Sequence, residues 1–183
     1  MGKKVILLAG MLGAGCTRTA EILSNKLNMN FINSEKVFRE IVAQERISFA
    51  DLSLMAKSGE IDIEDIVKSV VEDHINEGNV IVEGRVALLV LNNPHVDLKV
   101  FLWAPKDFRV KRVAERRKID EKEALEAIEE SDEERSQLVS RLYKRDWLDA
   151  DLYDIVINSS KWSFEEIADI IVAAYKAKIE HKS

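Results

Sequence analysis

A short stretch of small residues is the part of this chain most suited to binding phosphate. Three of its seven glycines, Gly10, Gly13 and Gly15, fall within six positions, and Thr17 follows them. Glycines let backbone N–H groups curl around an anion, and a helix that begins there points its positive end at the same place. The hydroxyl of Thr17 stands where it can coordinate a Mg²⁺ ion that bridges two phosphates. The residues predicted to bind the phosphates are Gly10, Gly13, Ala14, Gly15, Cys16, Thr17 and Arg18.

Cys16 is the residue that departs from the pattern of such loops, which usually have lysine at this position. A neutral thiol supplies no charge for the phosphates. Another cation then covers them (Arg18 or an arginine distant in the sequence), or nucleotide binds weakly, or turnover is lost. The start of a helix lowers the pKa of a thiol, so a redox-sensitive Cys16 is a further hypothesis. The alternative is a small side chain that simply fits.

The loop needs a strand before it and a helix after it, and the apolar pattern predicts both. Continuous apolar runs suit strands that are covered on both faces, as in a parallel sheet. Helical periodicity between them indicates an α/β fold with right-handed crossovers. Ser163 and Glu166 form a capping-box pair at the start of the last helix. The strands are expected at 5–9, 31–32, 80–82, 100–104 and 155–157, and two of the helices at 63–75 and 164–175.

Basic side chains recur on one predicted helix, just after the strand that ends at Ala104. Arg109, Arg112 and Arg116 are spaced three and four residues apart, so they share one helix face. Ligands of open α/β sheets bind beyond the carboxyl ends of the strands, where arginines can stabilise a transferring phosphate. The next stretch, 120–134, holds nine acids and one lysine and is interpreted as a solvated helix surface. The alternative for the basic residues, preferred for Arg109, is a solvated helix paired with those acids.

Composition excludes several classes of protein. The 183 residues are the size of one domain, and 33 acidic against 27 basic side chains give a net charge of −6. Proteins that bind duplex DNA or anionic membranes usually carry the opposite excess. No apolar run approaches the ~18 residues of a membrane-spanning helix. The one cysteine excludes an internal disulfide and favours a cytoplasmic location.

The motifs that follow the loop occur in an order typical of one enzyme family. They are Asn33-Ser-Glu-Lys-Val-Phe-Arg-Glu40, Val82-Glu-Gly-Arg85, the arginine-rich helix, and Tyr153-Asp-Ile-Val-Ile-Asn-Ser-Ser160. In their order and spacing, the chain resembles the cytidylate kinases, especially the archaeal-type, cytidylate-kinase-like branch of the nucleoside monophosphate kinases. The resemblance extends from Val5 to about Ala173.

The resemblance implies a P-loop NTPase fold with a central five-stranded parallel sheet flanked by helices. One kinase domain would span 1–183, with a helical monophosphate-binding insert at about 34–77 and a lid at about 112–145. The implied reaction transfers the γ-phosphoryl group of ATP, with Mg²⁺, to CMP or dCMP. The protein would act as a monomer or weak homodimer, without nucleic acid or membrane partners.

Matching positions also imply the site residues. At the acceptor site, Lys36 stands where relatives usually carry glycine in a Ser-x-Gly pattern, which places a long side chain where the acceptor approaches. The alternatives from the residues alone are an exposed helix arginine for Arg39 and a strand-end carboxylate for Glu83. The acceptor-binding residues would be Ser34, Arg39, Arg85 and Arg141, the Mg²⁺ ligands Thr17 and Glu83, and the catalytic arginines Arg112, Arg116 and Arg135.

Two other functions fit the same loop. Because Cys16 replaces lysine, the chain could be a non-catalytic or weakly active nucleotide-binding protein. It could also be a P-loop kinase for a small non-nucleotide substrate, which Ser34, Arg39 and Arg85 argue against.

Overall fold

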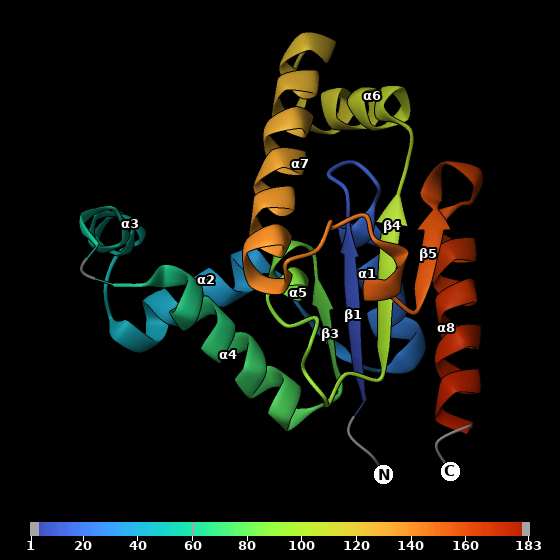
Figure 1. The fold of residues 1–183 in the computed structure, drawn as a ribbon, viewed down its shortest axis with the longest axis horizontal. Helices are drawn as coiled ribbons and strands as arrows, with labels where there is room; N and C mark the ends of the chain where they lie inside the picture. The colour runs from blue at the N-terminus through green and yellow to red at the C-terminus, as the bar shows by residue number, and fades with distance from the viewer. Residues whose placement is uncertain (1–3, 60, 181–183) are drawn as a thin grey trace.

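A five-stranded parallel sheet forms the centre of the molecule (Figure 1). The computed structural model describes residues 4–59 and 61–180. All six residues of the middle strand are buried, as continuous apolar runs predict for a strand covered on both faces. The sheet has the order β2-β3-β1-β4-β5, with β1 (Val5–Gly10), β2 (Asn30–Ile32), β3 (Val80–Glu83), β4 (Leu98–Trp103) and β5 (Ile155–Asn158).

Alternate side chains of β1 enter two hydrophobic cores, one on each face of the sheet. Ile6 and Leu8 pack with the apolar sides of α1 (Cys16–Leu27) and α8 (Phe164–Glu180). Val5, Leu7 and Ala9 point to the opposite face. The helices that cover this second face are α2 (Ser34–Glu45), α4 (Ile63–Glu77), α5 (Arg85–Leu88) and α7 (Glu121–Tyr143).

Two groups of helices extend beyond the sheet and border its carboxyl edge (Figure 1). On one side α2, α3 (Phe49–Ser58) and α4 form a lobe. Above the strand ends, α6 (Lys106–Arg117) packs against α7 around Val110, Val113, Ala124 and Ile128. Short 3-10 helices lie at Ala150–Leu152, before β5, and at Ser159–Lys161, between β5 and α8.

The predicted strands and the helix predicted at 63–75 are confirmed within one or two residues, whereas the last helix, predicted at 164–175, extends to Glu180. The four short apolar runs and the weaker run at 31–32 are all strands, and every strand pairing is parallel. The capping box exists, because Ser163 N donates to Glu166 at 2.7 Å and Glu166 N donates to the Ser163 hydroxyl at 3.2 Å. Among the residues described, no helix is both long and apolar enough to cross a membrane.

Candidate active site

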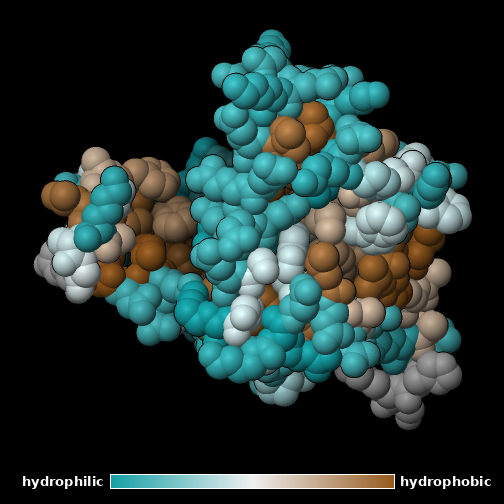
Figure 2. Space-filling model, turned by 45° about the horizontal axis from the view of Figure 1, so that its top comes forward, coloured by the Kyte–Doolittle hydropathy of each residue, from teal (hydrophilic) through white to brown (hydrophobic). Residues whose placement is uncertain are grey.

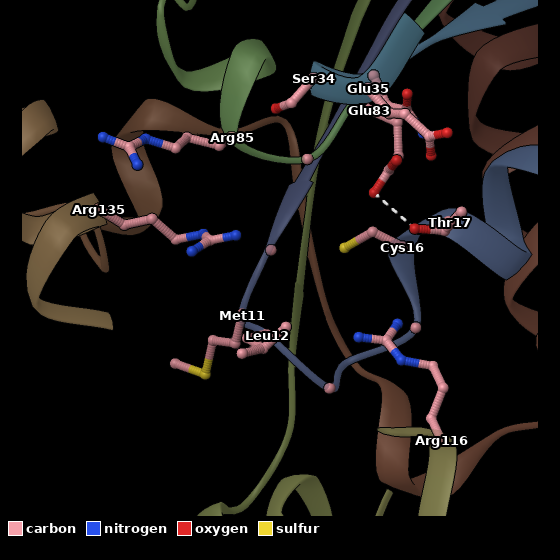
Figure 3. Close-up of a pocket in the computed structure, with 15 residues that line it drawn as sticks. Met11, Leu12, Cys16, Thr17, Ser34, Glu35, Glu83, Arg85, Arg116 and Arg135 are labelled. Atoms are coloured by element: carbon pink, nitrogen blue, oxygen red, sulfur yellow. Dashed lines mark hydrogen bonds between the residues drawn. The ribbon is translucent and has the colours of Figure 1, made fainter. Parts of the chain in front are cut away.

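A cavity of about 220 Å³ lies over the loop that joins β1 to α1, at the carboxyl edge of the sheet (Figure 3). The loop forms its floor, and the end of β3 and the start of α2 form one wall. Arg116 of α6 and Arg135 of α7 point toward the loop, whereas Arg85 of α5 lines the cavity with its guanidinium directed away from the loop. Most of the predicted phosphate, metal and arginine residues therefore meet in one place. The cavity is lined by Gly10, Met11, Leu12, Gly13, Gly15, Cys16, Thr17, Asn33, Ser34, Glu35, Glu83, Gly84, Arg85, Arg116 and Arg135.

The glycines of the loop are required by its backbone and by close packing. Gly15 has a φ of 96°, and a Cβ there would lie 2.5 Å from a ring carbon of Phe164. A Cβ on Gly10 would lie 2.6 Å from both the Cys16 sulfur and the Leu102 carbonyl oxygen. Ala14 is fully buried and lines none of the cavities described. The tight loop brings the positive end of α1 to the cavity floor.

Cys16 opens α1 and lines the cavity, but it is 8% exposed and packs against Gly10. Burial raises the pKa of its thiol, and the negative charge of Glu83 adds to the rise. The lowering expected at a helix start is therefore outweighed, and Cys16 stays a neutral thiol. Since thiolate is the reactive form, the hypothesis of a redox-sensitive Cys16 is not supported.

Glu83 and Thr17 bring two oxygen donors together beside the loop. The Thr17 hydroxyl donates to the Glu83 carboxylate at 3.2 Å (Figure 3). Glu83 is only 6% exposed, and this burial raises its pKa against the opposing effects of Thr17, Asn33, Arg135 and Arg116. A hydroxyl and a carboxylate are ligands that Mg²⁺ takes in phosphate-binding sites, so these two residues fit the predicted ion.

Three arginines around the loop have no carboxylate partner among the described residues. No ion pair within 4.0 Å involves Arg112, Arg116 or Arg135 in residues 4–59 and 61–180. Arg135 donates to Ser131 of its own helix, and its buried Nε has no hydrogen-bond partner in the described parts of the chain. Burial lowers its pKa, and Figure 3 shows its guanidinium directed across the cavity toward Cys16. These are the three arginines expected to be catalytic.

The other arginines of the predicted site are already paired with acids. Arg39 is 70% exposed on α2, is held by Glu35, and lines none of the described cavities. Arg85 lines the cavity and also contacts α7. Hydrogen bonds to Glu64 raise the pKa of Arg141. The pairs and their N–O distances are Arg18–Glu21 at 2.9 Å, Arg39–Glu35 at 2.6 Å, Arg85–Glu134 at 2.7 Å and Arg141–Glu64 at 2.6 Å.

Arg109 confirms the predicted pairing with the acidic stretch but corrects the prediction that this arginine is solvated. Its side chain is 4% exposed and makes two bonds to Asp132, at 3.0 and 2.8 Å. It also donates to the carbonyls of Ala104 and Leu12, and a Cβ on Gly13 would lie 3.0 Å from the Arg109 Cβ. Arg109 thus packs directly against the loop. Asp132 shows that the stretch 120–134 is not wholly a solvated surface.

A second cavity of about 340 Å³ adjoins the first and was not predicted from the sequence. Ser34 and Arg85 line both cavities, so the two lie next to each other. Lys36 does not obstruct either, because its Nζ donates to the Phe31 carbonyl at 2.9 Å and lies over the Phe31 ring. The remaining lining is mostly apolar and consists of Phe38, Ile63, Glu64, Val67, Val86, Leu89 and Leu138.

A third cavity of about 400 Å³ lies on the other side of the loop. It shares Gly13, Gly15, Thr17 and Arg116 with the first cavity and is closed by Arg112, Arg18 and Phe164. The guanidinium carbon of Arg112 lies 4.3 Å from the centre of the Phe164 ring. Phe164 has the apolar helix spacing of a core residue, so its position beside a cavity could not be predicted from that spacing.

Hydrophobic side chains also gather on the surface of the lobe that α2, α3 and α4 form (Figure 2). Phe49 and Leu54 on α3 are both exposed. The surface of α7 beside it is hydrophilic, as its acidic sequence predicts (Figure 2). The surroundings of the second cavity thus combine an apolar lobe with a charged helix.

Comparisons with known proteins agree with this geometry. The model of the cytidylate kinase-like family matches residues 5–161. A cytidylate kinase of Methanopyrus kandleri is 32% identical over 97% of this chain and 96% of its own length. One of Methanocaldococcus jannaschii is 30% identical over 93% and 96%. A shikimate kinase structure from Bacteroides thetaiotaomicron, 17% identical with a TM-score of 0.64 over 96% and 99% of the chains, shares the P-loop kinase fold.

Proposed function

The chain belongs to the cytidylate kinase-like family, and on that premise we propose that it transfers the γ-phosphoryl group of ATP to CMP or dCMP. The observation that carries the proposal is the meeting of three unpaired arginines around a glycine loop. Cations held without counter-charges at a helix start are arranged to receive anions. Cavities on both sides of the loop give room for two nucleotides whose phosphates meet above it.

The third cavity suits the base of the phosphate donor. Arg112 and Phe164 already stack there, and a planar base can stack on a guanidinium or on an aromatic ring. The donor phosphates would extend from this cavity over Gly13, Gly15 and Thr17 to the loop. This placement leaves the second cavity for the acceptor, whose phosphate would lie between Ser34 and Arg85.

Arg135 is our candidate for the charge that a loop lysine would supply. It comes from α7, lines the loop cavity with Cys16, and carries a buried donor without a partner. Phosphoryl transfer needs cations on the transferring oxygens, and Arg116 lines the same cavity. The buried Nε of Arg135 would gain a partner when a phosphate enters, because phosphate oxygens accept such bonds.

Thr17 and Glu83 would hold Mg²⁺ through a hydroxyl and a carboxylate oxygen. An ion bound there neutralises charge on the phosphate oxygens. Glu83 must be ionised for this role, and the raised pKa in the free protein shows that burial opposes its charge. Arg116 and Arg135 lie close enough to favour the ionised form.

A second candidate function, nucleotide binding without efficient transfer, is favoured by one residue. The thiol of Cys16 is neutral and buried, so the loop itself provides no side-chain cation. Under this alternative, ATP and CMP bind but ADP is not formed. A small non-nucleotide acceptor fits less well, because a largely apolar cavity of about 340 Å³ lies beside Ser34 and Arg85.

The test is ADP production with ATP, Mg²⁺ and each of CMP, dCMP, UMP, AMP and GMP. We expect turnover with CMP or dCMP that depends on Mg²⁺. Calorimetric titration of the same protein with ATP and CMP separates the two candidate functions. Binding of both without ADP above background would reject the kinase in favour of the binding protein. Turnover with another monophosphate alone would reject the proposed acceptor.

A further inference from the structure

One carboxylate borders the second cavity without a role in phosphate binding. Glu64, in the first turn of α4, lines this cavity among apolar side chains. Its two carboxylate oxygens accept hydrogen bonds from Arg141 of α7, at 2.9 and 2.6 Å, and Arg141 is not among the lining residues. Glu64 is the only carboxylate among the cavity's lining residues in the described part of the chain. Its position in a largely apolar cavity makes it suited to binding a polar group of the ligand.

The cavity fits a flat ring that enters from the phosphate end. Ser34 and Arg85 mark that end, because they line the phosphate cavity as well. Farther in, the walls are formed by the Phe38 ring and by aliphatic side chains such as Val67 and Leu89. A nucleobase attached to a phosphate at Arg85 would occupy this space, since aromatic and aliphatic surfaces suit the faces of a base.

Arg141 fixes the orientation of the Glu64 carboxylate. A bidentate arginine–carboxylate pair holds both groups in one plane. Each carboxylate oxygen has a second lone-pair site, so Glu64 can accept a further hydrogen bond from a ligand while Arg141 holds it. The carboxylate offers acceptors and no donor, so it can distinguish a base edge that carries a donor from one that carries an acceptor.

Cytosine and uracil differ at the group that such an acceptor distinguishes. Cytosine carries an amino donor at C4, whereas the uracil-type base carries a carbonyl acceptor there. A carboxylate attracts the first and repels the second. Given the proposed function, on which this step rests, we propose that Glu64 binds the exocyclic amino group of cytosine while Arg141 positions it. This contact would set the preference for CMP and dCMP over UMP.

The alternative role for the pair is to tie α4 to α7. A purely structural role predicts that loss of the pair lowers stability and weakens CMP and UMP binding equally. The proposed role predicts a change in the ratio of the two affinities. The ratio is therefore the quantity to measure, with thermal unfolding to confirm that each variant is folded.

The experiment compares CMP and UMP binding by calorimetry for the full chain, Glu64→Gln, Arg141→Gln and Asp65→Asn. Asp65 is the matched control, because it lies in the same helical turn and is exposed outside the cavity. We expect the natural chain to favour CMP by about 10- to 100-fold, and Glu64→Gln to reduce that ratio to about threefold or less. Arg141→Gln should reduce the ratio partly, and Asp65→Asn should leave it unchanged.

Equal affinities for CMP and UMP in the natural chain, or an unchanged ratio in Glu64→Gln, would overturn the inference. If the protein forms no ADP but Glu64→Gln abolishes its preference for CMP, the kinase proposal is rejected and the role of Glu64 in base recognition stands. If the protein turns over CMP but Glu64→Gln leaves the ratio of CMP to UMP affinity unchanged, the role of Glu64 is rejected and the kinase proposal stands. The two proposals therefore fail separately.

Discussion

Arginines occur in two different electrostatic settings in this molecule. Around the glycine loop, Arg112, Arg116 and Arg135 face cavities without a carboxylate within ion-pair distance, among the residues described. Around the second cavity, Arg141 is held by Glu64. Uncompensated arginines suit a ligand that carries its own negative charge, whereas a compensated pair suits recognition by hydrogen bonds. Under the proposed function, the difference divides the site into a phosphate half and a base half.

The phosphate half depends on burial as well as charge. Arg135 is buried enough to lower its pKa, and its Nε has no partner. A buried donor without a hydrogen bond lowers folding stability by about 1–3 kcal/mol. Such a loss at Arg135 indicates that this arginine serves a function rather than the stability of the fold. Arg85 joins the two halves, because it lines both cavities and is paired with Glu134.

Arg135→Gln should have the largest effect on activity. It removes a cation from the phosphate half, and we expect kcat with ATP and CMP to fall by about 100- to 1,000-fold. Arg117→Gln is the control, because Arg117 is exposed at the end of α6 and lines none of the described cavities. Steady-state kinetics of both variants test the comparison. Equal losses in the two would mean that the unpaired arginines have no special role.

Asp132→Asn should give the next largest effect, on stability. It leaves the charge of Arg109 buried without its partner, and breaking such a pair costs about 3 kcal/mol. Urea unfolding, compared with Glu133→Gln on the same exposed stretch, measures the difference. A loss below about 1 kcal/mol, the range of surface pairs, would show that this pair does not support the loop.

Glu83→Gln should weaken Mg²⁺-dependent activity by about 10- to 100-fold, because the ion loses a charged ligand.

Burial raises the folded-state pKa of Glu83 above its ordinary 4.5, so the ionised form of Glu83 lowers the stability of the fold. That cost is complete above the folded-state pKa and vanishes as pH falls below 4.5. The variant should therefore melt at a higher temperature than the natural chain at pH 7, and the difference should shrink on acidification. A lower melting temperature at pH 7 would contradict the sign of this effect.

The sheet and the loop were predictable because their signals are local. A continuous apolar run such as 5–9 marks a strand buried on both faces, and closely spaced glycines mark the turn after it. The burial of the Arg109–Asp132 pair depends on two helices that pack together, so a spacing pattern cannot distinguish a buried arginine from a solvated one. The base half was not predicted for the same reason. Its walls come from α2, α4, α5 and α7, and apolar helix residues look alike whether they face a core or a cavity.

We propose that Arg135 supplies the charge that Cys16 cannot. The most direct measurement is a double-mutant cycle on kcat for phosphoryl transfer, with Cys16→Lys and Arg135→Gln made singly and together. A lysine at position 16 would provide the missing cation. Arg135→Gln should therefore lower kcat by about 100-fold or more in the natural chain, but by less than about 10-fold in the Cys16→Lys background. A loss of the same factor in both backgrounds would contradict the account, because it would show that Arg135 and the loop position act independently.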